Sequence, residues 1–180
     1  SRTAVESQAL AALALRMMEA LHPAAPLNAT YPATADAFGE VAHDAPLFAG
    51  SFGDQQTVAL FVALSWFEGN FKQDAEGDCK ADAKGKCTVP AQSLCAFQVG
   101  VTHLASLGTT RAEILSDIKV CTKSARSLIA TSMKVCAKQP RSGWLGWYAA
   151  GGEGCDRGLA KSAHRMAKAD WLFAHYPAQL

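Results

Sequence analysis

The run from Val58 to Phe67 constrains the fold more than any other part of this sequence, because only one serine interrupts its apolar residues. A helix with apolar side chains on every face must be buried on every face. The run is too short to cross a membrane, which takes about 20 apolar residues. The sequence therefore predicts a central buried helix with Asp54 as its N-cap and Gly69 as its stop.

The rest of the chain is expected to be mainly α as well, because alanine is abundant and favours helices. The polar segment 72–94 is expected to form a loop or small hairpin after the central helix. We expect a single domain over residues 1–180, with an N-terminal helix and wrapping segment in 1–50 and the core in 51–180. Helical spacing and capping motifs predict further helices over residues 4–21, 36–43, 102–107, 110–137, 145–150 and 156–175.

Charge and hydropathy argue against two classes of partner. The formal net charge is +1, so we expect no nucleic-acid partner, which would require a basic stripe. No apolar run is long enough for a membrane span. The largely apolar segment 8–15 is short, and Glu6 and Arg16 flank it. We therefore interpret it as part of a helix rather than as a signal-peptide core. The chain is expected to be a mature secreted or periplasmic protein without a signal peptide.

An even number of cysteines in a chain of this size indicates disulfides and an oxidising compartment. The alternative is a zinc site, but the sequence has no Cys-x-x-Cys spacing and no histidine cluster. We therefore expect no metal and no cofactor. The six cysteines are Cys79, Cys87, Cys95, Cys121, Cys136 and Cys155.

Helix geometry restricts how these cysteines can pair. Cys121 and Cys136 lie near opposite ends of one predicted helix, about 22 Å apart, and a disulfide needs Cα atoms within about 7 Å. Cys79 and Cys87 bracket a short polar loop and form the most plausible pair. The remaining predicted pairs are Cys95–Cys121 and Cys136–Cys155.

Glu68 follows the apolar run directly. A carboxylate there would lie against apolar surroundings and at the negative end of the helix dipole, and both effects favour its protonated form. A carboxylic acid that keeps its proton near neutral pH can act as a general acid. The alternative is that Glu68 is simply the first solvated residue after the helix.

Three short segments resemble the motifs of lytic transglycosylases and goose-type lysozymes in order and approximate spacing. In that family a Glu-Ser pair ends a helix, a Gly-Leu-Met-Gln segment follows, and Tyr-Asn-Ala-Gly comes later. The matching segments here are Ser65–Phe71, Cys95–Gly100 and Tyr148–Gly152. The resemblance extends over residues 54–152 and implies a lysozyme-like (goose-type) helical domain.

The resemblance also implies roles for individual residues. Glu68 would be the catalytic acid and base, and Gln98 and Tyr148 would contact a sugar substrate, with Gly151 beside them. Phe97 and Trp144 could offer flat faces to sugar rings. Core packing is the alternative for the aromatic residues, and a surface position is the alternative for Gln98.

The chain departs from the family motifs at four positions, which are Gly69, Cys95, Phe97 and Ala149. At Gly69 the family has serine, and at Ala149 it has asparagine. These two changes motivate the hypothesis that the substrate is unusual, for example in its N-acetylation. The departures at Gly69, Cys95 and Ala149 together also motivate a non-enzymatic alternative.

The resemblance leaves the chemical outcome open. Lytic transglycosylases use the sugar's own 6-hydroxyl and form a 1,6-anhydro product, whereas goose-type lysozymes add water. A second carboxylate could activate that water. Asp74, Glu76 and Asp78 are the candidates in the following loop, and each has a solvated loop position as its alternative.

We therefore expect a monomeric muramidase that cleaves the β-1,4 bond between N-acetylmuramic acid and N-acetylglucosamine in peptidoglycan glycan strands. One alternative is a catalytically idle module that binds wall glycan or a protein through the same surface. Another is a disulfide-bonded helical protein of unrelated function, in which the motif matches are accidental.

Overall fold

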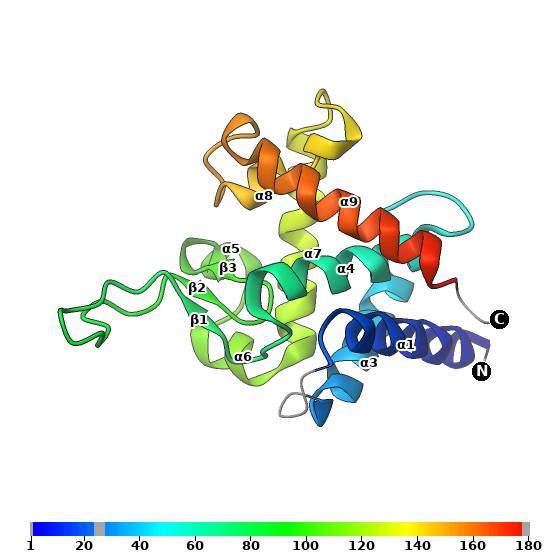
Figure 1. The fold of residues 1–180 in the computed structure, drawn as a ribbon, viewed down its shortest axis with the longest axis horizontal. Coiled ribbons are helices and arrows are strands. Elements are labelled where there is room, and N and C mark those ends of the chain that lie inside the picture. The colour runs from blue at the N-terminus through cyan, green and yellow to red at the C-terminus, as the bar shows by residue number, and fades with distance from the viewer. Residues whose placement is uncertain (1, 24–27, 178–180) are drawn as a thin grey trace.

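Helix α4 (Gly53–Gly69) lies at the centre of the fold in a computed structural model of the chain, which describes residues 2–23 and 28–177 (Figure 1). Its residues from Val58 to Leu64 are completely buried. The prediction of a central buried helix is therefore confirmed. Helices α1 and α3 pack against each other and against one part of α4, and helix α9 packs along another.

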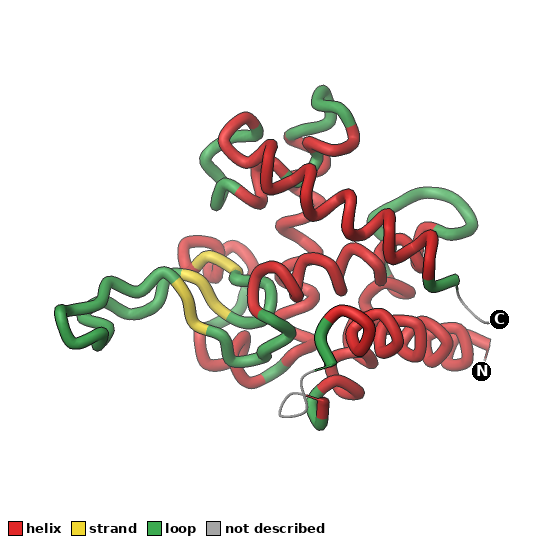
Figure 2. Tube along the Cα trace, viewed as in Figure 1, coloured by secondary structure: helices red, strands yellow, loops and turns green. Residues whose placement is uncertain are grey.

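The described chain is mainly helical, as predicted, and it also contains one small sheet (Figure 2). Short 3-10 turns precede α5, α8 and α9. Besides α4, the helices given by the described residues are α1 (Arg2–Leu21), α3 (Tyr31–Asp44), α5 (Leu104–Leu107), α6 (Arg111–Ser116), α7 (Ile118–Val135), α8 (Gly146–Ala149) and α9 (Leu159–His175).

A single hydrophobic core joins the N-terminal helices to the rest of the described chain. It extends from Leu10 in α1 to Leu172 in α9. Phe38 of α3 contributes its ring to an aromatic cluster with Phe61 of α4, at a centroid distance of 5.8 Å. Residues from both expected segments, 1–50 and 51–180, therefore share one core.

The sheet consists of β1 (Glu76–Gly77), β2 (Ser93–Leu94) and β3 (Val99–Gly100), in that spatial order and antiparallel throughout. The hairpin expected within 72–94 corresponds to β1 and β2. Strand β3 lies outside that range, so the expected boundary was too narrow. The chain between β1 and β2 projects far beyond the sheet (Figure 2).

The predicted N-cap of α4 was wrong. The N-cap is Phe52, and Asp54 lies in the first turn instead. The helix ends at Gly69, as predicted, and the next residue, Asn70, has the left-handed φ of 49° that closes it. Helix α3 is longer than the turn expected over 36–43, because Pro32 occupies its first turn, where no backbone N–H is needed.

The long helix predicted over 110–137 is divided at Asp117. The Thr110 hydroxyl accepts from Glu113 N, so the predicted capping motif starts α6. Asp117 is extended, and its side chain accepts from the backbone N–H groups of Lys119 and Val120. An aspartate that bonds these groups ends one helix and starts the next.

All three predicted disulfides are present. Cys79–Cys87, Cys95–Cys121 and Cys136–Cys155 join their sulfur atoms. No helix within residues 2–23 or 28–177 is long and apolar enough to cross a membrane. Residues 24–27 of the expected wrapping segment lie outside the described residues.

Candidate functional site

Glu68 lies in the last turn of α4, and its side chain is 20% exposed. Its Oε1 accepts a hydrogen bond from Arg165 Nε of α9 at 2.8 Å, and Nη2 of the same guanidinium forms an ion pair with it at 2.7 Å. The surroundings expected for Glu68 were apolar, and the structure corrects this, because a guanidinium lies against one carboxylate oxygen. No group in the described chain donates to the other oxygen, Oε2. Charge-assisted hydrogen bonds of this kind fix the position of the carboxylate.

Arg165 is itself held on several sides. Its side chain is 11% exposed, its Nη1 donates to the Lys161 carbonyl at 3.3 Å, and its guanidinium carbon lies 5.1 Å from the centroid of the Phe67 ring. These contacts join the end of α4 to the middle of α9. The sequence analysis missed Arg165, which lies 97 residues after Glu68.

A pocket of about 330 Å³ lies at the C-terminal end of α4. The residues carried over from all three motifs meet there, although they come from α4, from the turn between β2 and β3, and from α8. Asp78, Ser93 and Lys161 also line the pocket, and the sequence analysis proposed no binding role for Ser93 or Lys161. The full lining is Glu68, Asp78, Ser93, Phe97, Gln98, Tyr148, Ala149, Gly151 and Lys161.

Tyr148 is positioned by its hydroxyl group. The hydroxyl donates to the Phe97 carbonyl at 2.6 Å, and the Tyr148 backbone N–H donates to Ser132 Oγ at 3.0 Å. Burial raises the pKa of the Tyr148 phenol well above its usual range, the Glu68 carboxylate raises it further, and Arg165 opposes the rise. The phenol is therefore a neutral donor in the wall of the pocket.

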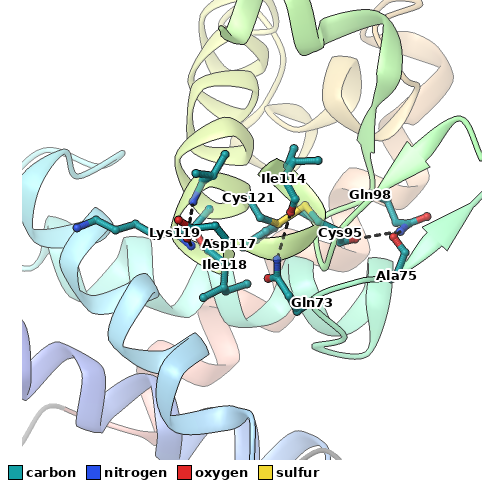
Figure 3. The surroundings of a disulfide bond; sticks show 12 residues. Gln73, Ala75, Cys95, Gln98, Ile114, Asp117, Ile118, Lys119 and Cys121 are labelled. Atoms are coloured by element: carbon teal, nitrogen blue, oxygen red, sulfur yellow. Dashed lines mark hydrogen bonds between the residues drawn. A yellow bond between two sulfur atoms is a disulfide. The ribbon is translucent and has the colours of Figure 1, made fainter. Parts of the chain in front are cut away.

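Gln98 is positioned by backbone atoms of the turn that leads into β3. Its Nε2 donates to the Cys95 carbonyl at 3.0 Å (Figure 3). A Cβ on Gly77 of β1 would lie only 2.1 Å from Gln98 Oε1, so Gly77 leaves the space in which the amide lies. The Gln98 side chain thus lines the pocket, while its amide nitrogen also donates a hydrogen bond to the backbone of the turn.

Two departures from the family motifs have local structural reasons. A Cβ at Gly69 would lie 2.7 Å from the Ala96 carbonyl oxygen, so the close approach of α4 to Ala96 excludes a serine there. Cys95 has a left-handed φ of 63°, a conformation that suits the glycine of the family motif. A cysteine at this position instead forms the Cys95–Cys121 disulfide, which anchors the residue to α7 (Figure 3).

Two predicted substrate contacts need correction. The Phe97 ring is completely buried between Phe38 and Phe61, at centroid distances of 5.4 and 5.8 Å, so it cannot offer a face to a sugar. Trp144 does not line the Glu68 pocket. It lines a separate pocket with Phe48 and Arg141. Trp147 lies closer, in a hollow of about 70 Å³ that shares four lining residues with the Glu68 pocket.

The three candidate second carboxylates lie in different environments. Asp74 is exposed and lies 4.0 Å from Lys72. Glu76 bonds to Arg111 at 3.0 Å. Asp78 alone among them lines the Glu68 pocket, where its Oδ2 accepts from the Ser93 hydroxyl. Of these three carboxylates, Asp78 is therefore the one that lies beside Glu68 in the pocket.

The described residues contain no group of three His, Cys, Asp or Glu side chains that could hold a metal ion. The polar side chains that line the pocket are one ion-paired carboxylate, a neutral phenol, an amide, a second carboxylate, a serine hydroxyl and a lysine. Comparisons with protein-family models, curated proteins and solved structures found no match for this chain.

Proposed function

We propose that the protein is a secreted peptidoglycan muramidase of lysozyme-like fold, with Glu68 as general acid and base. The main support is the meeting of Glu68, Gln98 and Tyr148 in one pocket, although 80 residues of sequence separate Glu68 from Tyr148. Accidental motif matches give no reason for these three residues to lie together. The three disulfides fit an oxidising compartment.

In this proposal Glu68 donates a proton to the glycosidic oxygen through Oε2, while Arg165 holds Oε1. Loss of the leaving sugar produces an oxocarbenium-like centre. Glu68 then takes a proton from the attacking oxygen, which belongs either to the sugar's 6-hydroxyl or to water. Asp78 lies in the same pocket and is the candidate to orient that water.

The decisive experiment is digestion of purified peptidoglycan by the wild type and by Glu68→Gln, with mass spectrometry of the soluble products. The amide cannot transfer a proton, so fragment release should fall about 10²- to 10⁴-fold. Glu40→Gln is the matched control, since Glu40 is also ion-paired but lies on α3 and outside the pocket. Equal release by Glu68→Gln and the wild type would refute the proposal.

The products would also specify the reaction. Anhydro ends would identify transglycosylation, and reducing ends would identify hydrolysis. Parallel digestion of native and chemically deacetylated peptidoglycan would test the proposed N-acetylation preference, which rests on Gly69 and Ala149. Equal turnover of the two walls would count against such a preference.

A second candidate is a glycan-binding module in which Glu68 is catalytically idle. The ion pair with Arg165 favours it, because a carboxylate held in this way also serves to join α4 to α9. This candidate predicts that the wild type binds the insoluble wall and releases no fragments from it.

A further inference from the structure

A finger formed by residues 79–88 projects from the small sheet, to the left in Figure 1. Every residue from 80 to 90 is exposed. Lys80, Lys84 and Lys86 lie on this finger together with a single acidic residue, Asp82. The finger therefore carries three positive charges and one negative charge, a balance of +2 in a chain of net charge +1.

A disulfide and backbone hydrogen bonds constrain the finger. The Cys79–Cys87 disulfide closes its base. Asp82 N donates to the Lys86 carbonyl at 2.8 Å, and Gly85 N donates to the Asp82 carbonyl at 3.0 Å. A preordered loop loses little conformational entropy when it binds a partner.

The lysine charges of the finger are available to a partner. No ion pair joins Lys80, Lys84 or Lys86 to any residue that the structure describes. Oδ1 of Asp82 accepts from the backbone N–H groups of Lys84 and Lys86, both at 2.9 Å, so this carboxylate is used in holding the loop. Three ammonium groups thus extend into solvent from a loop that a disulfide and internal hydrogen bonds constrain.

The base of the finger adjoins the Glu68 pocket. Asp78 precedes the finger directly, Ser93 follows it in β2, and both residues line the pocket. The Ser93 hydroxyl donates to Asp78 across this base. The finger therefore begins at the wall of the pocket in which the proposed function places the glycan.

We propose that the finger binds the stem-peptide carboxylates of the same glycan strand that occupies the pocket. This inference rests on the proposed function. The chemistry of the finger favours carboxylates on a polymer over two other anions. It has no aromatic residue on which a nucleic-acid base could stack, and its tip has only alanine and glycine besides the charged residues, with no large side chain to enter a membrane.

The test compares the triple variant Lys80→Gln/Lys84→Gln/Lys86→Gln with the matched triple variant Lys123→Gln/Lys134→Gln/Lys138→Gln. The control removes the same charge from exposed lysines on and just beyond α7, away from the pocket lining. Binding is measured by co-sedimentation with insoluble peptidoglycan at low ionic strength. We expect the finger variant to bind about tenfold more weakly than the wild type, and the control variant to bind normally.

A second wall preparation identifies the bound group. Conversion of the stem-peptide carboxylates to neutral amides should remove the difference between the finger variant and the wild type. Added salt should reduce the same difference, because exposed charges are screened. Equal binding of the finger variant and the control to the untreated wall would overturn the inference. Undiminished wild-type binding to the amidated wall, or stronger binding to anionic lipid vesicles than to peptidoglycan, would also overturn it.

Fragment release from the same samples separates this inference from the proposed function. Finger-dependent binding without fragments from any wall would support the docking surface and refute the muramidase. Fragment release that depends on Glu68, together with wall binding that the finger substitutions do not change, would support the muramidase and refute the docking surface.

Discussion

At the scale of single residues, Arg165 decides what surrounds Glu68. A carboxylate at the end of a buried helix would otherwise be only partly solvated, and burial without a partner is costly. Arg165 supplies a hydrogen bond and a second ion-pair contact to Oε1, and Phe67 and the Lys161 carbonyl hold the guanidinium in place. The pair therefore positions the proposed catalytic group and also joins two helices.

Arg165→Leu should lower the free energy of unfolding by about 2 kcal/mol, because Glu68 loses its partner in a partly buried position. Arg165→Lys should recover only part of this loss, since an ammonium group cannot reproduce the two guanidinium contacts. Urea unfolding provides the measurement. The double variant Glu68→Gln/Arg165→Leu should lose less than the sum of the single variants, and additivity would contradict a direct interaction.

Tyr148 should make stability depend on alkaline pH. Its pKa is raised above the ordinary value of 10.0, so the folded protein holds the phenolic proton more tightly than the unfolded chain. This stabilisation is complete below the unfolded pKa, and is lost as pH rises from there through the folded pKa. The loss has a limiting slope of about 1.4 kcal/mol per pH unit.

Tyr148→Phe provides the comparison. Near neutral pH it should cost about 1 to 2 kcal/mol, because the Phe97 carbonyl loses its donor. The stability difference between the wild type and Tyr148→Phe should shrink as pH rises above the ordinary pKa of tyrosine. Urea unfolding over this pH range measures it, and a constant difference would show that the phenol titrates normally.

At the scale of elements, the break at Asp117 allows α6 and α7 to point in different directions. Helix α6 packs near β2, whereas α7 packs against α3 and α8. Cys121 lies in the first turns of α7, from which its disulfide reaches Cys95. A continuous helix over 110–137 could not make both sets of contacts.

Asp117→Ala should reduce the free energy of unfolding by about 1 kcal/mol, because two backbone N–H groups of α7 lose their acceptor. Asp117→Ser should retain most of the stability, since a serine hydroxyl can accept the same bonds. Thermal unfolding compares the two variants. Equal losses would indicate that the side chain does not act as a cap.

At the scale of the whole molecule, the disulfides differ in what they hold. Cys95 and Cys121 are both fully buried and join the turn before β3 to α7. Cys79 and Cys87 close the exposed finger instead. Opening the finger can remain a local event, whereas opening the buried pair disturbs the core.

The variant Cys95→Gly/Cys121→Ala should therefore lose about 3 kcal/mol of stability. Glycine is the suitable replacement at position 95, because the backbone there is left-handed. Cys79→Ala/Cys87→Ala should change the global unfolding transition by less than about 1 kcal/mol. Calorimetry of both variants under oxidising conditions measures the difference, and equal losses would contradict this ranking.

Much of the fold could be predicted because it depends on short-range patterns. The apolar run placed α4, the Thr110 motif placed the start of α6, and cysteine spacing excluded a Cys121–Cys136 pair. The break at Asp117 was missed because an aspartate is equally compatible with an exposed position inside a helix. Asp117 acts as a cap only because α7 packs in a different direction from α6, and that direction is set by the core.

The candidate site was only partly predictable. Glu68, Gln98 and Tyr148 carry local motif signals, and the pocket contains all three. The ring directions of Phe97 and Trp144 depend on packing across the core, so their roles could not be read from their positions in the sequence. Arg165 and Lys161 resemble any other charged residues on the exposed face of a helix.

The sequence by itself determined that α4 is buried, that the chain is mainly helical, and which cysteines could not pair, because apolar periodicity and the helical rise act over a few turns. Only the tertiary structure decided that Arg165 meets Glu68, that Gly69 must lack a side chain, and that Asp78 rather than Asp74 or Glu76 faces the pocket. These features depend on contacts between elements far apart in the chain, and such contacts are set by how the whole core packs.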